Sequence, residues 1–195
     1  MFTGIIETLG TIEKIKTEDG NVNYLVNSII NEELKVDQSL SHDGVCLTVT
    51  DRNNKGHWVT AVRETLERTN LKNWKEGHIL NLERCMIANG RFDGHIVQGH
   101  VDQIAKVDSI VNADGSWYFR FKYEQSDHLI VEKGSITING VSLTCFNAND
   151  NKFEVAIIPY TYRHTNFCKL KVGDMVNLEF DVIGKYVKRI LNQPS

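Results

Sequence analysis

Residues 43–84 read DGVCLTVTDRNNKGHWVTAVRETLERTNLKNWKEGHILNLER, and residues 139–180 read NGVSLTCFNANDNKFEVAIIPYTYRHTNFCKLKVGDMVNLEF. The two stretches align without a gap at a constant offset of 96 residues, and 14 of the 42 aligned positions are identical. Ordinary composition gives roughly 2 or 3 identities by chance over such a length. A long period with only two copies is typical of a duplicated domain rather than of a solenoid. The chain is therefore predicted to contain one domain twice.

The similarity continues upstream of these stretches with a slip of one residue. The segment GIIETLGTIEKI, at residues 4–15, parallels HIVQGHVDQIAKV at residues 95–107. We therefore place a first domain at residues 1–92 and a second at residues 93–181. The tail, residues 182–195, has no counterpart in the repeat.

Each copy consists mainly of short β-rich runs bounded by turn residues. In the first copy the candidate strands are Thr11–Lys16, Tyr24–Asn27, Val45–Thr50, Trp58–Val62 and Ile79–Glu83. Tight turns with positive φ are expected at residues 19–20, 114–115 and 149–151. One short helix is expected in each copy, near residues 64–69 and 160–165. Many short strands at this spacing predict an all-β sandwich or barrel, and closing the sheet would remove its exposed edges.

The tail has a different periodicity. Its apolar residues recur at steps of three and four, which predicts an amphipathic helix over Val182–Gln193. They are Ile183, Tyr186, Val187, Ile190 and Leu191. This helix could pack on its own barrel or on the same helix of neighbouring chains.

Composition excludes several classes of function. A net charge of −3 gives no electrostatic footprint for nucleic acid. No apolar run of about 18 residues and no basic leader occur, so neither a membrane span nor a signal peptide is expected. The four cysteines are widely spaced and form no CxxC pair, which argues against a zinc site and a disulfide framework and favours reduced thiols in the cytoplasm.

Six motifs in register resemble the riboflavin synthase family over essentially the whole chain. They are MFTGI at 1–5, DGVCLTV at 43–49, RETLERTNL at 63–71, GHIVQGHVD at 94–102, KGSITINGVSLT at 133–144 and VNLEFDVIGKYV at 176–187. The resemblance implies an all-β fold of two tandem six-stranded Greek-key β-barrels with short helices. It also implies a C-terminal helix that gathers three chains into a homotrimer, with each active site between the N-terminal barrel of one subunit and the C-terminal barrel of another.

The resemblance also implies a reaction. Members of this family carry out the last step of riboflavin biosynthesis, in which a four-carbon unit passes between two 6,7-dimethyl-8-ribityllumazine molecules. One becomes riboflavin and the other 5-amino-6-ribitylaminouracil. A duplicated chain suits this transfer, because two copies of one pocket can hold two copies of one substrate. No cofactor and no metal are implied. Association with lumazine synthase is expected only by analogy, since no residue of the chain supports it.

Each copy presents a short polar triplet after its Gly-Val pair, Cys46-Leu47-Thr48 and Ser142-Leu143-Thr144. Alternate residues of a strand share a face, so the outer members of each triplet should point the same way. Such small side chains often fill a barrel. With the resemblance, hydrogen bonding to the substrate ring is the favoured interpretation. Because one copy has Cys46 where the other has Ser142, the two pockets are not equivalent.

His95 and His100 lie five residues apart in GHIVQGH. On a strand this spacing would put them on opposite faces, which disfavours a shared metal site. The adjacent Gly94 and Gly99 predict close backbone approach to a ligand or to the other barrel. The resemblance places Gly99, His100 and Val101 near the bound ring and makes both histidines candidates for proton transfer. For His95, a hydrogen-bonded core imidazole is the structural alternative.

The catalytic candidates are therefore Cys46, His95, His100, Ser142 and Asp181, of which Asp181 rests on the resemblance alone. The resemblance further implies substrate-binding residues at the N-terminal segment, around each triplet and near the short helices. These are Gly4, Ile5, Ile6, Ser39, Thr60, Ala61, Val62, Arg63, Glu64, Thr65, Lys133, Ile158, Pro159, Tyr160, Thr161, Tyr162 and Arg163. For the charged ones, an exposed surface group is the alternative.

Two departures from the family pattern occur. Asn139 stands where many relatives have Asp, and Val45 where some have a second cysteine, so neither is expected to take part in acid–base chemistry. Three other functions compete with this interpretation. A non-catalytic carrier of one lumazine or flavin is the strongest, but both triplets are intact here. A flavin reductase lacks support because no GxGxxG or phosphate loop occurs. Nothing in the sequence requires a purely structural trimer.

Overall fold

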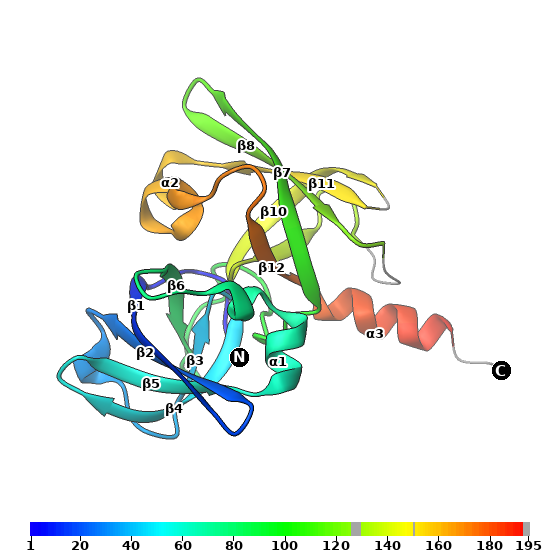
Figure 1. Ribbon diagram of the computed structural model, residues 1–195. Helices are drawn as coiled ribbons and strands as arrows, with labels where there is room; N and C mark the ends of the chain where they lie inside the picture. Colours follow the sequence, from blue (N-terminus) through cyan, green and yellow to red (C-terminus); the bar gives the residue numbers. More distant parts are fainter. Residues whose placement is uncertain (126–129, 150, 193–195) are drawn as a thin grey trace.

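Two closed six-stranded β-barrels and a C-terminal helix make up the computed structural model, which describes residues 1–125, 130–149 and 151–192 (Figure 1). The N-terminal barrel contains β1 (Thr8–Glu18), β2 (Asn21–Ser28), β3 (Ser39–His42), β4 (Val45–Asn53), β5 (Gly56–Ala61) and β6 (Ile79–Arg84). The C-terminal barrel contains β7 (Gln103–Ala113), β8 (Ser116–Tyr123), β9 (Ser135–Ile138), β10 (Val141–Asn149), β11 (Lys152–Ile157) and β12 (Met175–Phe180).

Both barrels have the same antiparallel topology. The order β1-β2-β5-β4-β3-β6 of the first recurs as β7-β8-β11-β10-β9-β12 in the second. Between β5 and β6 lie α1 (Arg63–Arg68) and the 3₁₀ turn η2 (Asn70–Asn73); their counterparts are α2 (Pro159–His164) and η3 (Asn166–Lys169). A further turn, η1 (Asn31–Glu33), precedes β3. The predicted duplication and barrel fold are therefore confirmed.

The expected strands all exist, and most are longer than predicted. In the first copy one strand was not predicted, β3, because four residues are too few for alternation to be recognised. Val62 lies outside β5 because it caps the N-terminus of α1. The expected turns at residues 19–20 and 114–115 have positive φ, whereas residue 150 of the third turn lies outside the described part of the chain.

Each barrel closes around its own apolar core. The C-terminal core is rich in aromatic rings, with Phe119, Phe121 and Phe167 fully buried. The N-terminal barrel has fewer buried aromatic rings, Tyr24 and Trp74, and it buries two histidines, His42 and His57, whose Nε2 atoms lie 2.9 Å apart. One ring must donate and the other accept, which two neutral rings can do. Burial lowers the pKa of His42 well below its ordinary value and that of His57 to about 4.

Buried asparagine side chains join the two barrels across an approximate two-fold relationship. Asn81 Nδ2 donates to the carbonyl of Asn139 at 2.8 Å, and Asn177 Nδ2 donates to the carbonyl of Asp43 at 2.9 Å. The backbone N–H of Asn166 donates to Asn81 Oδ1 at 2.7 Å. Asn81 and Asn177 are an identical pair of the repeat, so the duplicated residues supply the interface between the copies.

Helix α3 (Val182–Leu191) extends away from both barrels (Figure 1). Asp181 caps it, with Oδ1 accepting the N–H of Ile183 at 2.9 Å. The apolar side chains identified in the sequence are 49–77% exposed, so this helix does not bury its apolar face on its own barrels. Gln193 lies beyond the described part of the chain. Among the helices that the structure describes, none is long and apolar enough to span a membrane.

Candidate functional site

Small polar residues on the outer surface of each barrel form two equivalent half-sites. In the N-terminal barrel Ser41 of β3 pairs with Cys46 of β4, and in the C-terminal barrel Thr137 of β9 pairs with Ser142 of β10. Leu47, next to Cys46, is buried in the core, so the side chains of Cys46 and Thr48 point away from it. The triplets therefore do not fill the barrels. They face outward, where a ligand can reach them.

The C-terminal half-site is a cavity of about 490 Å³. Its lining consists of Tyr118, Lys133, Ser142, Leu143, Thr144, Phe146, Ala156, Ile158 and Thr161. Lys133 Nζ lies 5.1 Å from the centre of the Phe146 ring, which places a cation over an aromatic face at the edge of the cavity. Six of the expected binding residues thus meet at one place: Lys133, Ser142, Leu143, Thr144, Ile158 and Thr161.

The N-terminal half-site contains a thiol where the other has a hydroxyl. Cys46 is half-buried and lies beside Ser39 and Thr48, which face each other across β3 and β4. Burial raises the pKa of the Cys46 thiol above its ordinary value, so at neutral pH this group is a neutral hydrogen-bonding thiol rather than a thiolate. The residues equivalent to Lys133 and Phe146 are Asp37 and Thr50. The half-sites therefore differ in charge as well as in their central side chain.

Each half-site is bordered by a segment that comes from the other copy of the repeat. The backbone N–H of Cys46 donates to the carbonyl of Gly99 at 2.9 Å, and that of Ser142 donates to the carbonyl of Gly4 at 2.8 Å. Gly4 and Gly99 have φ of +79° and +78°, and a Cβ at Gly99 would lie 2.7 Å from Cys46 Cβ. The predicted close approach at Gly99 is confirmed, and its neighbour is the N-terminal barrel.

His95 belongs to the C-terminal half-site, where its ring is held at both nitrogens. Nδ1 lies 2.7 Å from Ser142 Oγ, and Nε2 lies 3.1 Å from Thr137 Oγ1. Burial lowers the pKa of His95, and the nearby carboxylate of Asp181 opposes this shift. The ring is therefore a neutral imidazole at neutral pH, which can accept a proton. His100 is exposed, and segment 95–101 is not a regular strand, so the two histidines are separated by a loop rather than by the two faces of a strand.

The remaining expected residues are divided between the core, the surface and the short helices. Ala61 is fully buried in the N-terminal core, so only its backbone can reach a ligand. Thr60 Oγ1 donates to Asn23 Oδ1 at 2.6 Å. Tyr160 stacks on His164, and Tyr162 stacks on Trp117. The others are exposed, namely Ile5, Val62, Arg63 and Arg163, or partly buried, namely Ile6, Thr65, Val101 and Pro159.

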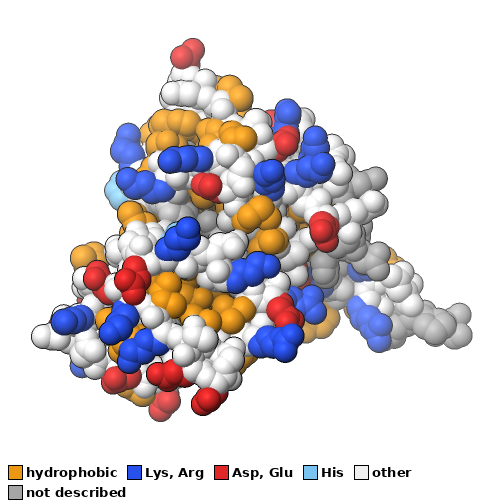
Figure 2. Space-filling model, viewed as in Figure 1, with side chains coloured by type: hydrophobic (Ala, Val, Ile, Leu, Met, Phe, Trp, Pro, Cys, Tyr) orange, Lys and Arg blue, Asp and Glu red, His pale blue; other side chains and the backbone are white. Residues whose placement is uncertain are grey.

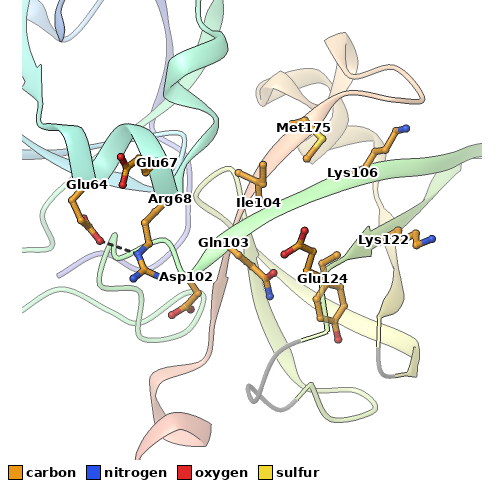
Figure 3. Close-up of a pocket in the computed structure, with 11 residues that line it drawn as sticks. Glu64, Glu67, Arg68, Asp102, Gln103, Ile104, Lys106, Lys122, Glu124 and Met175 are labelled. Atoms are coloured by element: carbon orange, nitrogen blue, oxygen red, sulfur yellow. Dashed lines mark hydrogen bonds and ion pairs between the residues drawn. The ribbon is translucent and has the colours of Figure 1, made fainter. Parts of the chain in front are cut away.

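A second hollow, of about 630 Å³, lies between α1 and strands β7 and β8 (Figure 3). Glu64, expected to bind substrate, lines it and pairs with Arg68 at 2.9 Å. Asp102, Lys106, Lys122 and Glu124 give it charges of both signs. Neither Cys46 nor Ser142 lines this hollow.

Two buried carboxylates of the site, Glu83 and Glu179, were missed in the sequence. They occupy equivalent positions on β6 and β12, and each accepts backbone N–H groups of a bordering segment. Their identity in the two copies was the available signal. The described residues contain no group of three or more His, Cys, Asp or Glu side chains suited to a metal. Acidic and basic side chains are interspersed on the face shown in Figure 2.

Comparisons with known proteins agree with this architecture. The family model described as "Lumazine binding domain" matches twice, over residues 3–85 and 98–181. The chain is 41% identical over 193 residues to riboflavin synthase of Actinobacillus pleuropneumoniae, covering 98% of this chain and 90% of that protein. It is 40% identical over 197 residues to riboflavin synthase of Bacillus subtilis (strain 168), covering 100% and 92%. The crystal structure of LumP complexed with riboflavin has the same fold, with a TM-score of 0.86 at 22% identity over 92% of this chain and 99% of that chain.

Proposed function

The chain belongs to the lumazine binding domain family and, within it, to the riboflavin synthases, and from that premise we propose the reaction, the residues and the assembly through which it acts. The proposed reaction is the dismutation of two 6,7-dimethyl-8-ribityllumazine molecules. A four-carbon unit passes from one to the other and gives riboflavin and 5-amino-6-ribitylaminouracil. This makes the enzyme a transferase whose two substrates are the same compound.

The observation that carries the proposal is the pair of equivalent outward-facing half-sites. Cys46 and Ser142 lie at the same position of two barrels with the same topology. Two copies of one substrate therefore find two similar surfaces. Holding two reactants in attack geometry can lower the activation barrier by about 7–11 kcal/mol, and we expect this to be the main catalytic contribution of such a site.

The difference between the half-sites supports different roles. His95, a neutral imidazole in contact with Ser142, is the proposed proton acceptor in the C-terminal half-site. Lys133 adds a positive charge at the edge of the same cavity. The N-terminal half-site offers a neutral thiol and Asp37 at the equivalent positions. We assign the stabilisation of negative charge on a substrate to the half-site with the cation.

A homotrimer is proposed from helix α3. Its apolar side chains are exposed, and it extends away from the barrels, which leaves this face available to other copies of the chain. Asp181 connects this helix to the site, because it caps α3 and its charge acts on His95. An active site shared between the N-terminal barrel of one subunit and the C-terminal barrel of another would bring unlike half-sites together. The free cysteines among the described residues accord with a cytoplasmic location.

The test is to incubate the purified protein with 6,7-dimethyl-8-ribityllumazine alone and to follow both compounds by visible absorbance. Riboflavin formed at half the rate of lumazine loss is the expected result. Tight binding with altered fluorescence and no riboflavin would instead identify a ligand carrier, and the proposed reaction would be wrong.

A further inference from the structure

We propose that Glu83 and Glu179 are positioning residues, each of which shapes the half-site of the opposite barrel. Glu179 lies in the C-terminal barrel and would control the half-site of Cys46, whereas Glu83 lies in the N-terminal barrel and would control that of Ser142. The inference rests on the proposed function in that it takes these half-sites to be the binding surfaces.

Glu179 binds the segment that enters the C-terminal barrel. Its Oε1 accepts the backbone N–H of Gln98 at 2.8 Å, and its Oε2 accepts those of Gly99 and His100 at 3.0 and 3.1 Å. The side chain is buried, with 2% of the residue exposed. Hydrogen bonds from several N–H groups to one carboxylate are strong and directional, so they fix the conformation of this segment.

Glu83 makes the same arrangement at the N-terminus of the chain. Its Oε1 accepts the N–H of Thr3 at 2.7 Å and the Thr3 hydroxyl at 2.9 Å, and its Oε2 accepts the N–H of Gly4 at 3.0 Å. This residue is also buried. Glu83 and Glu179 thus hold equivalent segments in equivalent ways, each within its own half of the chain.

The held segments end at the opposite barrel. Gly99, bound by Glu179, accepts the N–H of Cys46, and Gly4, bound by Glu83, accepts the N–H of Ser142. The hydrogen bond at Gly99 therefore places a segment of the C-terminal half of the chain against the N-terminal half-site. The hydrogen bond at Gly4 places a segment of the N-terminal half against the C-terminal half-site.

Apolar residues next to the held segments also pack on the opposite barrel. Val101, which follows the segment held by Glu179, packs on the apolar core of the N-terminal barrel. Ile6, which follows the segment held by Glu83, packs on the core of the C-terminal barrel. Each half-site thus depends on a carboxylate of the other barrel for the position of its backbone border.

Replacement by Gln isolates this role, because the side chain keeps its size but loses its charge and one of its two acceptors. The amide NH₂ would face backbone N–H donors, so the segment must shift. Glu83→Gln and Glu179→Gln are the two variants. Glu76→Gln is the matched control, since Glu76 also accepts a backbone N–H, that of Ile15 at 3.3 Å, but is exposed and remote from both segments.

The readout is riboflavin protection of one reactive group in each half-site, followed by peptide mass spectrometry. Alkylation of Cys46 by iodoacetamide, carried out at alkaline pH so that part of the thiol is ionised, reports on the N-terminal half-site. Reductive methylation of Lys133 reports on the C-terminal one. In Glu179→Gln we expect protection of Cys46 to require about tenfold more riboflavin, with protection of Lys133 little changed. Glu83→Gln should show the opposite pattern, and Glu76→Gln neither effect.

The outcomes separate this inference from the proposed reaction. Equal weakening at both groups in either variant, or weakening on the same barrel as the mutated residue, would overturn the cross-barrel assignment even if turnover falls. A melting temperature close to that of the unmutated protein shows that the variant is folded. Should Glu→Gln fail to fold, the shorter Glu179→Asp and Glu83→Asp, which keep the charge, provide the same comparison. Failure of riboflavin to protect either group in the unmutated protein would count against the proposed half-sites themselves.

Discussion

His95 Nδ1 lies 2.7 Å from Ser142 Oγ, and the other ring nitrogen is held by Thr137, so the imidazole is fixed against the central hydroxyl of one half-site only. The equivalent central residue of the other half-site, Cys46, lies instead beside Ser39 and Thr48. The proton-transfer chemistry that the duplicated fold supports is therefore asymmetric.

Changing His95 to Gln should remove this asymmetry. We expect turnover to fall by about two orders of magnitude, in the range that general bases contribute. Burial lowers the His95 pKa, so the unmutated enzyme should keep the neutral ring at neutral pH and lose activity only below pH 6.5, as the ring becomes protonated. The acid limb of kcat plotted against pH should be absent in His95→Gln. An unchanged acid limb would assign the titration to another group.

Cys46 should act through hydrogen bonding rather than as a nucleophile. Because burial raises the pKa of its thiol, Cys46→Ser should retain turnover within a few fold, as Ser142 serves at the equivalent position. Cys46→Ala, which removes the polar group, should lose about tenfold or more. Steady-state rates of the two variants decide between the roles, since a nucleophilic cysteine would lose most activity in both.

Helix α3 should determine the oligomeric state. Placing Asp at Tyr186 and Ile190, which are 67% exposed each, should convert the assembly to monomers and abolish turnover while leaving the barrels folded. Light scattering coupled to size exclusion measures the mass, and Arg189→Gln on the same helix is the control. An active monomer would show that the site needs no second subunit.

Gly99 and Gly20 separate two effects of a positive φ. Both have φ near +80°, but a Cβ at Gly20 would meet no atom within 4 Å, whereas one at Gly99 would lie 2.7 Å from Cys46 Cβ. Gly20→Ala should cost about 1 kcal/mol of unfolding free energy from backbone strain alone. Gly99→Ala should cost about 3 kcal/mol or more, because the segment must also move. Urea denaturation gives both values, and equal losses would mean that the contact at Cys46 is easily relieved.

The buried histidine pair should make stability depend on pH. The pKa of His57 is lowered from 6.5 to about 4, so between these values the unfolded chain binds more protons than the folded one. The contribution of His57 to the free energy of unfolding is therefore fully present above pH 6.5 and is lost as the pH falls toward 4. For His57, which is fully buried, this amounts to about 3 kcal/mol. His57→Gln keeps a donor for His42 and should flatten this part of the curve in urea unfolding at pH 4.5 and 7.

The repeat made the duplication predictable, and several of its 14 identities fall where the two barrels meet. Gly44 and Gly140 meet at the interface, and Asn81 and Asn177 hydrogen-bond across it. The alternating triplets correctly indicated a shared face. Whether that face was inside or outside could not be read from Cys46 and Thr48 alone, since small polar residues occur in both places.

The roles of Glu83 and Glu179 were not predictable for a different reason. In the sequence each is one acidic residue at the end of a β-rich run, where an exposed charge is the usual expectation. The two glutamates become buried hydrogen-bond acceptors only because the fold packs residues 3–4 against Glu83 and residues 98–100 against Glu179. Contacts over some 80 residues of sequence separation leave no local pattern.

The exchange of bordering segments between the barrels has a consequence for the ancestry of the chain. If residues 1–92 were made alone, their Cys46 surface would lack its Gly99 border, and their own residues 3–6 would have no second barrel to cover. Two such fragments could satisfy each other by a reciprocal swap, since a two-fold pair presents the same patch twice. The present polypeptide thus has the form of a swapped homodimer fused into one chain, after which each half was free to acquire its own central side chain.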